Sequence, residues 1–206
     1  MAQFFKIHPV NPQIRLVRQT AEIIRSGGVI AYPTDSGYAL ACGIGHRDAL
    51  ERICRIRRLD EKHHFTLVCR DLKEVSAYAM FDTPVYRLLK AHTPGFYTFI
   101  LRATKEVPRR LTHSKQKTIG LRIPDHPIVQ ALLAELGEPM LTTTLIFPGE
   151  TEPMTQAETI RMRLENQVDL VIDGGPGGSI PTTMVDLVED IPKILRIGKG
   201  DPKPFE

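Results

Sequence analysis

The most informative segment of the sequence reads Val29-Ile30-Ala31-Tyr32-Pro33-Thr34-Asp35-Ser36-Gly37-Tyr38. An apolar, β-branched run that ends at a proline is typical of a buried strand that runs into a loop, so we expect a strand over residues 29–32. The loop that follows carries two hydroxyls, a carboxylate and a glycine within four residues. Ligands of open α/β sheets bind beyond the carboxyl ends of strands, which makes this loop a candidate binding site. The alternative is a local turn in which Asp35 and Ser36 only satisfy backbone groups.

The remaining sequence predicts helices that alternate with strands early and strands that cluster late. The first helix is expected between an N-cap at Asn11 and a stop at Gly27-Gly28. Further helices are expected over 48–58, after the capping residue Asp71, and over 84–91, 127–136 and 156–165. Strands are expected over 65–69, 97–101, 118–123, 141–145, 168–172, 182–187 and 193–197. This order predicts an α/β protein with a mixed parallel and antiparallel open sheet, in one domain over residues 1–206.

Composition favours an ordinary globular protein, with 42% hydrophobic and 25% charged residues. No apolar run approaches the about 20 residues of a membrane span, and the N-terminus lacks a signal-peptide layout. The three cysteines, Cys42, Cys54 and Cys69, have no CxxC spacing. We therefore expect reduced thiols, a cytoplasmic location, no membrane contact and no metal site.

Charge is distributed unevenly along the chain, although the net charge is only +3. Residues 46–126 hold 17 Lys/Arg against 9 Asp/Glu, whereas residues 127–206 hold 6 against 13. A basic surface in the middle third would suit a polyanionic partner such as RNA. The alternative is that the segregation along the chain cancels in three dimensions.

Five motifs in this order resemble the YrdC/YciO family over nearly the whole chain, and the YciO branch in particular. They are Pro33-Thr34-Asp35-Ser36-Gly37-Tyr38, Thr93-Pro94-Gly95-Phe96-Tyr97-Thr98, Gly120-Leu121-Arg122-Ile123-Pro124-Asp125-His126-Pro127, Pro181-Thr182-Thr183-Met184-Val185-Asp186-Leu187 and Leu195-Arg196-Ile197-Gly198. The resemblance implies a twisted sheet flanked by helices, with a positively charged concave surface. It also implies RNA binding and, in catalytic members, synthesis of threonylcarbamoyl-adenylate from ATP, L-threonine and bicarbonate with Mg²⁺.

The resemblance also assigns a nucleotide- and substrate-binding set, together with departures from the catalytic pattern. The set comprises Thr34, Arg57, Arg122, Thr142, Thr144, Thr182 and Arg196. The Lys-x-Arg motif of catalytic members falls on Arg57-Arg58-Leu59, the Ser-x-Asn motif on Thr144-Leu145-Ile146, and a threonine-holding histidine on Val68. Removing one group that stabilises transition-state charge typically costs on the order of 10²–10³-fold in rate. Weak or absent synthase activity is expected, and no catalytic residue is assigned.

Three functions remain open at this stage. The first is binding of double-stranded or structured RNA, such as tRNA or rRNA, through Arg52, Arg55, Arg58, Lys62, Arg109, Arg110, Lys115 and Lys117. The second is an enzyme of tRNA threonylcarbamoyladenosine metabolism, either a weakened synthase or an activity that removes the group. The third is a ribosome-assembly or regulatory factor. No cofactor is expected to bind tightly, and ATP and Mg²⁺ would bind only to an active pocket. His63-His64 would contact phosphate, act as an acid/base pair, or simply be exposed.

Overall fold

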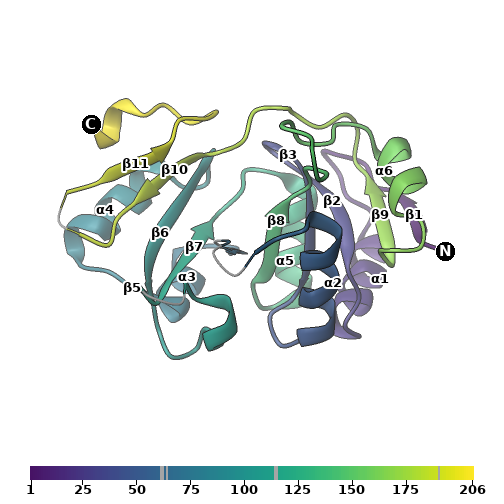
Figure 1. The fold of residues 1–206 in the computed structure, drawn as a ribbon, viewed down its shortest axis with the longest axis horizontal. Coiled ribbons are helices and arrows are strands. Elements are labelled where there is room, and N and C mark those ends of the chain that lie inside the picture. The colour runs from purple at the N-terminus through teal and green to yellow at the C-terminus, as the bar shows by residue number, and fades with distance from the viewer. Residues whose placement is uncertain (61–62, 64, 114–115, 190) are drawn as a thin grey trace.

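The fold is built on a mixed sheet in which the two chain termini lie near opposite ends (Figure 1). The computed structural model describes residues 1–60, 63, 65–113, 116–189 and 191–206. Within these residues the sheet has 11 strands in the order β1-β9-β2-β3-β8-β4-β7-β6-β10-β11, and β5 pairs with β6. The predicted α/β class with a mixed, helix-flanked sheet is confirmed.

The strands are β1 Gln3–Lys6, β2 Ile30–Thr34, β3 Gly37–Gly43, β4 Thr66–Val68, β5 Ala79–Met80, β6 Tyr97–Ala103, β7 Thr118–Arg122, β8 Met140–Thr144, β9 Leu170–Asp173, β10 Thr183–Asp186 and β11 Lys193–Arg196. Strand β9 pairs in parallel with β1 and β2, β4 with β7, and β6 with β10. The pairs β2–β3, β3–β8, β4–β8, β6–β7 and β10–β11 are antiparallel.

Helices cover both faces of the sheet. They are α1 Ile14–Arg25, α2 Arg47–Arg57, α3 Leu72–Tyr78, α4 Thr83–His92, α5 Pro127–Leu136 and α6 Ala157–Leu164, with short 3₁₀ turns η1 Arg109–Leu111 and η2 Lys203–Phe205. Alternation along β3 separates the faces, because side chains of successive strand residues point to opposite sides. Ala39 and Ala41 belong to the apolar cluster of α1 and α5, whereas Leu40 and Cys42 pack in the cluster that includes α2.

Strand β3 is the main element that the sequence analysis missed. The expected polar loop after residue 32 is a tight turn, with Thr34 paired to Gly37, and the chain returns at once as an antiparallel strand. Gly37 has φ +141°, a conformation that L side chains rarely adopt, so glycine permits this turn. The residues of β3 are all buried. The strand therefore lacks the alternation of polar and apolar residues by which a strand is recognised.

Helix boundaries follow the predicted signals except at the first helix. The N-cap predicted at Asn11 is wrong, because α1 begins after Gln13, which makes no side-chain cap hydrogen bond. The Asn11 main-chain N–H instead donates to Nδ1 of His8 at 3.0 Å. Asp71 caps α3 as predicted, accepting a hydrogen bond from the Glu74 N–H at 2.9 Å. Gly137 ends α5 in the left-handed conformation.

Cys42, Cys54 and Cys69 are free thiols. Burial raises the pKa of Cys42 to about 12, so this thiol is a core group rather than a nucleophile. None of the helices in the described part of the chain is long and apolar enough to cross a membrane.

Candidate functional site

Five of the seven predicted pocket residues line one small hollow. Arg122 ends β7, Thr142 and Thr144 lie on β8, Thr182 directly precedes β10, and Arg196 ends β11. The hollow measures about 80 Å³ and is completed by Ala39, His63, Thr66, Thr98, Thr143 and Met184. Residues as distant in the sequence as Ala39 and Arg196 thus meet because β3, β8, β4, β7, β6, β10 and β11 are successive in the sheet.

The hollow opens on the face of the sheet that carries α1 and α5. Arg122 is in register with Val68, and Thr142 is in register with Ala41. Both Val68 and Ala41 belong to the apolar cluster of α1 and α5. Register partners point to the same side of a sheet, so Arg122 and Thr142 face that side as well.

Threonine hydroxyls give the hollow a polar lining. The hydroxyls of Thr98 and Thr182 lie 2.7 Å apart. The Thr142 hydroxyl donates to the Leu40 carbonyl at 3.0 Å and lies 3.0 Å from the Tyr32 hydroxyl. Burial raises the pKa of Tyr32, so its phenol is protonated and available as a hydrogen-bond donor at neutral pH.

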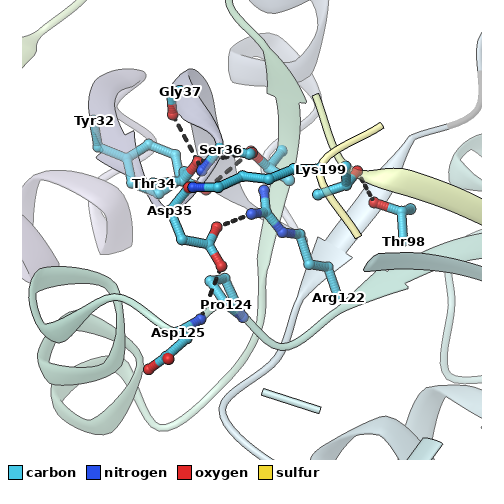
Figure 2. Close-up of polar contacts among 12 residues, drawn as sticks. Tyr32, Thr34, Asp35, Ser36, Gly37, Thr98, Arg122, Pro124, Asp125 and Lys199 are labelled. Carbon is cyan, nitrogen blue, oxygen red and sulfur yellow. Dashed lines mark hydrogen bonds and ion pairs between the residues drawn. The ribbon is translucent and has the colours of Figure 1, made fainter. Parts of the chain in front are cut away.

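Arg122 is held by an ion pair with Asp35, the carboxylate of the β2–β3 turn (Figure 2). Their side chains are 8% and 4% exposed, so the pair is shielded from water. The other Asp35 oxygen accepts a hydrogen bond from the Asp125 N–H at 3.0 Å. The Nε of Arg122 is buried without a hydrogen-bond partner among the described residues. Burial lowers the pKa of Arg122 to about 10, which keeps the guanidinium charged at neutral pH.

Arg196 provides the second cation of the hollow. Its Nε donates to the Thr182 carbonyl at 3.0 Å, and its Nη2 donates to the Thr182 hydroxyl at 3.2 Å. Arg196 forms no ion pair with any residue in the described ranges. Burial lowers the pKa of Arg196. Unlike Arg122, it therefore offers a positive charge that no described carboxylate neutralises.

The turn that carries Asp35 is fixed by the segment after β11. The Lys199 ammonium donates to the Asp35 carbonyl at 2.7 Å (Figure 2). Its Nζ also lies 3.9 Å from the centre of the Phe96 ring. A Cβ on Gly37 would lie 2.7 Å from the Gly178 carbonyl oxygen, so the glycine is also needed for close packing. The position of the Asp35 carboxylate is thus defined by contacts from three distant segments.

The other two predicted pocket residues lie elsewhere. The Thr34 hydroxyl donates to the Gly37 carbonyl at 2.6 Å and accepts from the Ser36 N–H at 3.2 Å, so it stabilises the turn. The local-turn alternative, which concerned Asp35 and Ser36, is wrong for Asp35, because its carboxylate pairs with Arg122. Arg57 ends α2 and is not among the residues that line the hollow. Its Nε is buried without a partner among the described residues, and burial lowers its pKa.

Several lining residues were not predicted. Thr98 pairs with Met184 across β6 and β10, and Thr66 pairs with Gly120 across β4 and β7. Their polar positions alternate with buried apolar neighbours, a signal that could have identified them. The His63 Nε2 lies 3.2 Å from the Thr143 hydroxyl, and the ring packs edge-on against Phe65. His63 therefore borders the hollow, whereas His64 lies outside the described residues.

The described members of the predicted RNA-contacting set lie outside the hollow, on α2 and its C-cap and on the segment that includes η1. Arg52 is ion-paired with Asp169 at 2.8 Å, and Arg110 donates to the Ile44 and Gly45 carbonyls at 3.3 Å. The side chains of Arg55, Arg58, Arg109 and Lys117 are exposed. Lys62 and Lys115 lie outside the described residues. Helix α2 covers the face opposite the hollow, so these cations form a separate surface.

The hollow does not offer a carboxylate for a metal. None of its described lining residues is acidic, and Asp35 is already paired with Arg122. Mg²⁺ prefers carboxylate and phosphate oxygens. Any magnesium here would therefore be held by the phosphates of a bound nucleotide rather than by the protein.

Comparison with known proteins identifies relatives along the whole chain. The family Sua5/YciO/YrdC, described as "Telomere recombination", matches residues 22–198. The Escherichia coli K12 protein YciO is 59% identical over 205 residues, which covers 100% of both chains. The crystal structure of E. coli YciO superposes with a TM-score of 0.97 over 100% of both chains. A threonylcarbamoyl-AMP synthase of Vibrio vulnificus is 28% identical over 164 residues, covering 78% of this chain and 87% of that protein.

Proposed function

The chain belongs to the Sua5/YciO/YrdC family. Because its hollow is lined by arginine and threonine side chains together, we propose that it is an RNA-binding protein with a nucleotide-type pocket. The observation that carries the proposal is the meeting of Arg122, Arg196 and the threonines in one hollow. Structured RNA, such as tRNA or rRNA, would lie against the exposed cations. Because the hollow opens on the opposite face of the sheet, the phosphate bound there would come from an end or an unpaired segment of the RNA that passes around the protein.

The pocket half of the proposal rests on the chemistry of the lining. Arginine and hydroxyl donors are the groups that bind phosphate oxygens in proteins. Arg196 is held by two hydrogen bonds to Thr182, so its guanidinium is already oriented before a ligand arrives. Pre-oriented donors bind with a smaller loss of conformational entropy.

The surface half rests on exposed cations that no described carboxylate neutralises. Arg55 and Arg109 are exposed, and neither is ion-paired with a residue in the described ranges. The Arg110 hydrogen bonds to the Ile44 and Gly45 carbonyls connect the segment of η1 to the loop that precedes α2. Contacts of this kind bind the backbone of double-stranded RNA without sequence preference.

The test is a fluorescence anisotropy titration of a labelled tRNA transcript with wild type and variants. Arg55→Ala/Arg109→Ala should weaken binding and make the dependence of log K on log salt shallower by about 2, because two phosphate contacts are lost. Arg15→Ala/Arg87→Ala is the matched control, since both residues are exposed on other helices. The surface half of the proposal fails if the two double variants bind RNA equally well.

The second candidate is a threonylcarbamoyl-AMP synthase, and the similarity to the Vibrio vulnificus enzyme favours it. Two observations weigh against full activity. Leu59, Ile146 and Val68 stand where the resemblance implies polar catalytic groups, and Arg57 lies outside the hollow. Incubation with ATP, L-threonine and bicarbonate tests this candidate. Pyrophosphate release at ordinary enzyme rates would establish the synthase and overturn our preference for RNA binding without synthesis.

A further inference from the structure

We infer that Asp35 limits how much negative charge a ligand of the hollow can carry. The hollow would then accept a singly charged phosphodiester and discriminate against a triphosphate. This inference rests on the proposed nucleotide-type pocket and specifies what that pocket admits. It makes Asp35 a specificity-determining residue, a role that depends on its charge rather than on the shape of the turn.

Charge is the first argument. Arg122 is the more deeply buried of the two cations, and the Asp35 carboxylate already neutralises it. Of the described charged groups that line the hollow, Arg196 alone carries a positive charge without a carboxylate partner. A phosphodiester brings one negative charge, which Arg196 balances. A triphosphate brings several negative charges. The Lys199 ammonium beside the turn is already engaged by the Asp35 carbonyl and the Phe96 ring, so the additional charges would face Asp35 without a free cation of the lining to balance them.

The unpartnered Arg122 Nε is the second argument. It is buried, lacks a hydrogen-bond partner among the described residues, and belongs to a side chain that lines the hollow. Buried donors without partners are rare, because leaving them unsatisfied is costly. A neutral or singly charged oxygen at this position would satisfy the donor while the Asp35 ion pair stays intact.

Size is the third argument. The hollow measures about 80 Å³, whereas pockets that enclose small-molecule ligands are typically about 300–1,000 Å³. A volume of this size suits one phosphate-sized group and leaves the rest of the ligand outside. A group presented by a larger molecule such as RNA meets this requirement.

The position of Asp35 is fixed, which makes its effect persistent. The Asp125 N–H holds one carboxylate oxygen, and Lys199 holds the carbonyl of the same residue (Figure 2). An incoming anion cannot displace the carboxylate without breaking the Asp125 hydrogen bond as well as the ion pair. The neutralisation of Arg122 therefore belongs to the ligand-free and the bound protein alike.

The experiment measures the direct binding of three probes by isothermal titration calorimetry: the dinucleotide ApA, AMP and ATP without magnesium. Wild type is expected to bind ApA at least as tightly as ATP. Asp35→Asn keeps the size of the side chain and removes its charge, and should shift the ApA-to-ATP preference towards ATP by at least about tenfold. Glu138→Gln removes one exposed carboxylate beyond the far end of α5 and should leave the preference unchanged.

Each outcome is decisive. The wild-type series needs no variant, so a strong wild-type preference for ATP overturns the inference even if Asp35→Asn fails to fold. An unchanged preference in folded Asp35→Asn also overturns it, while nucleotide binding would still support the pocket. If wild type binds RNA but none of the three probes binds, the nucleotide-type pocket fails together with this inference. The surface half of the proposed function then survives.

Discussion

The ion pair between Asp35 and Arg122 predicts that substitution of Asp35 alone strongly lowers the free energy of unfolding. Asp35→Ala leaves the Arg122 guanidinium buried and uncompensated, since the side chain is only 8% exposed. Removing one partner of a buried ion pair typically costs about 3–5 kcal/mol of unfolding free energy. For a protein of this length, a loss of about 3 kcal/mol lowers the melting temperature by about 6–12 °C.

The same reasoning predicts a rescue by a second substitution. Replacing both partners of a buried pair with apolar residues is often neutral or stabilising, because no uncompensated charge remains. Asp35→Ala/Arg122→Met is therefore expected to recover most of the stability that Asp35→Ala loses. The interaction between the two substitutions follows from a double-mutant cycle, which isolates the contribution of the pair.

The assay is urea-induced unfolding followed by circular dichroism, with thermal unfolding as a second measurement. The exposed pair Arg47–Glu51, at 2.8 Å on α2, provides the control. Glu51→Ala should cost less than about 1 kcal/mol, because exposed ion pairs contribute little. The reasoning is refuted if Asp35→Ala costs no more than Glu51→Ala, or if the double variant is as unstable as Asp35→Ala.

Three further predictions concern other parts of the molecule. Arg196→Gln should weaken the binding of ApA tenfold or more, because charged hydrogen bonds contribute about 1.5–3 kcal/mol; binding equal to wild type would remove Arg196 from the site. Phe205→Ala should cost about 3–5 kcal/mol in urea unfolding, since the ring is buried against His92, Tyr97 and Phe99; a loss below about 1 kcal/mol would contradict that packing. Burial, with Arg122 nearby, lowers the pKa of His126 to about 4 from 6.5. The unfolded chain then binds a proton that the folded state does not, so His126 makes stability fall as pH drops from 6.5 towards 4. His126→Asn should flatten this part of a urea-unfolding pH series, and an identical slope in both proteins would refute the assignment.

The sequence was sufficient where elements carry local signals. Strand β7 was predicted from its alternation, and the boundaries of α3 and α5 from Asp71 and Gly137. Strand β3 was missed because burial on both faces removes that alternation, and the α1 N-cap was misplaced because Asn11 is used in a turn with His8.

The candidate site was predictable in part for a similar reason. Arg122, Thr142 and Thr182 were assigned from the family resemblance, and the sheet order brings them together. The pairing of Asp35 with Arg122 could not be read from the sequence, because 87 residues separate them and their contact depends on the tight β2–β3 turn. The role of Thr34 in that turn was likewise hidden until the turn was seen.

RNA binding itself tests the account most directly. The affinity of the wild-type protein for a tRNA transcript, measured by anisotropy over a range of salt concentrations, should be highest at low salt. Log K should fall linearly with log salt as counterions are released. An absence of binding at the lowest salt concentration, with a correctly folded protein, would contradict the account.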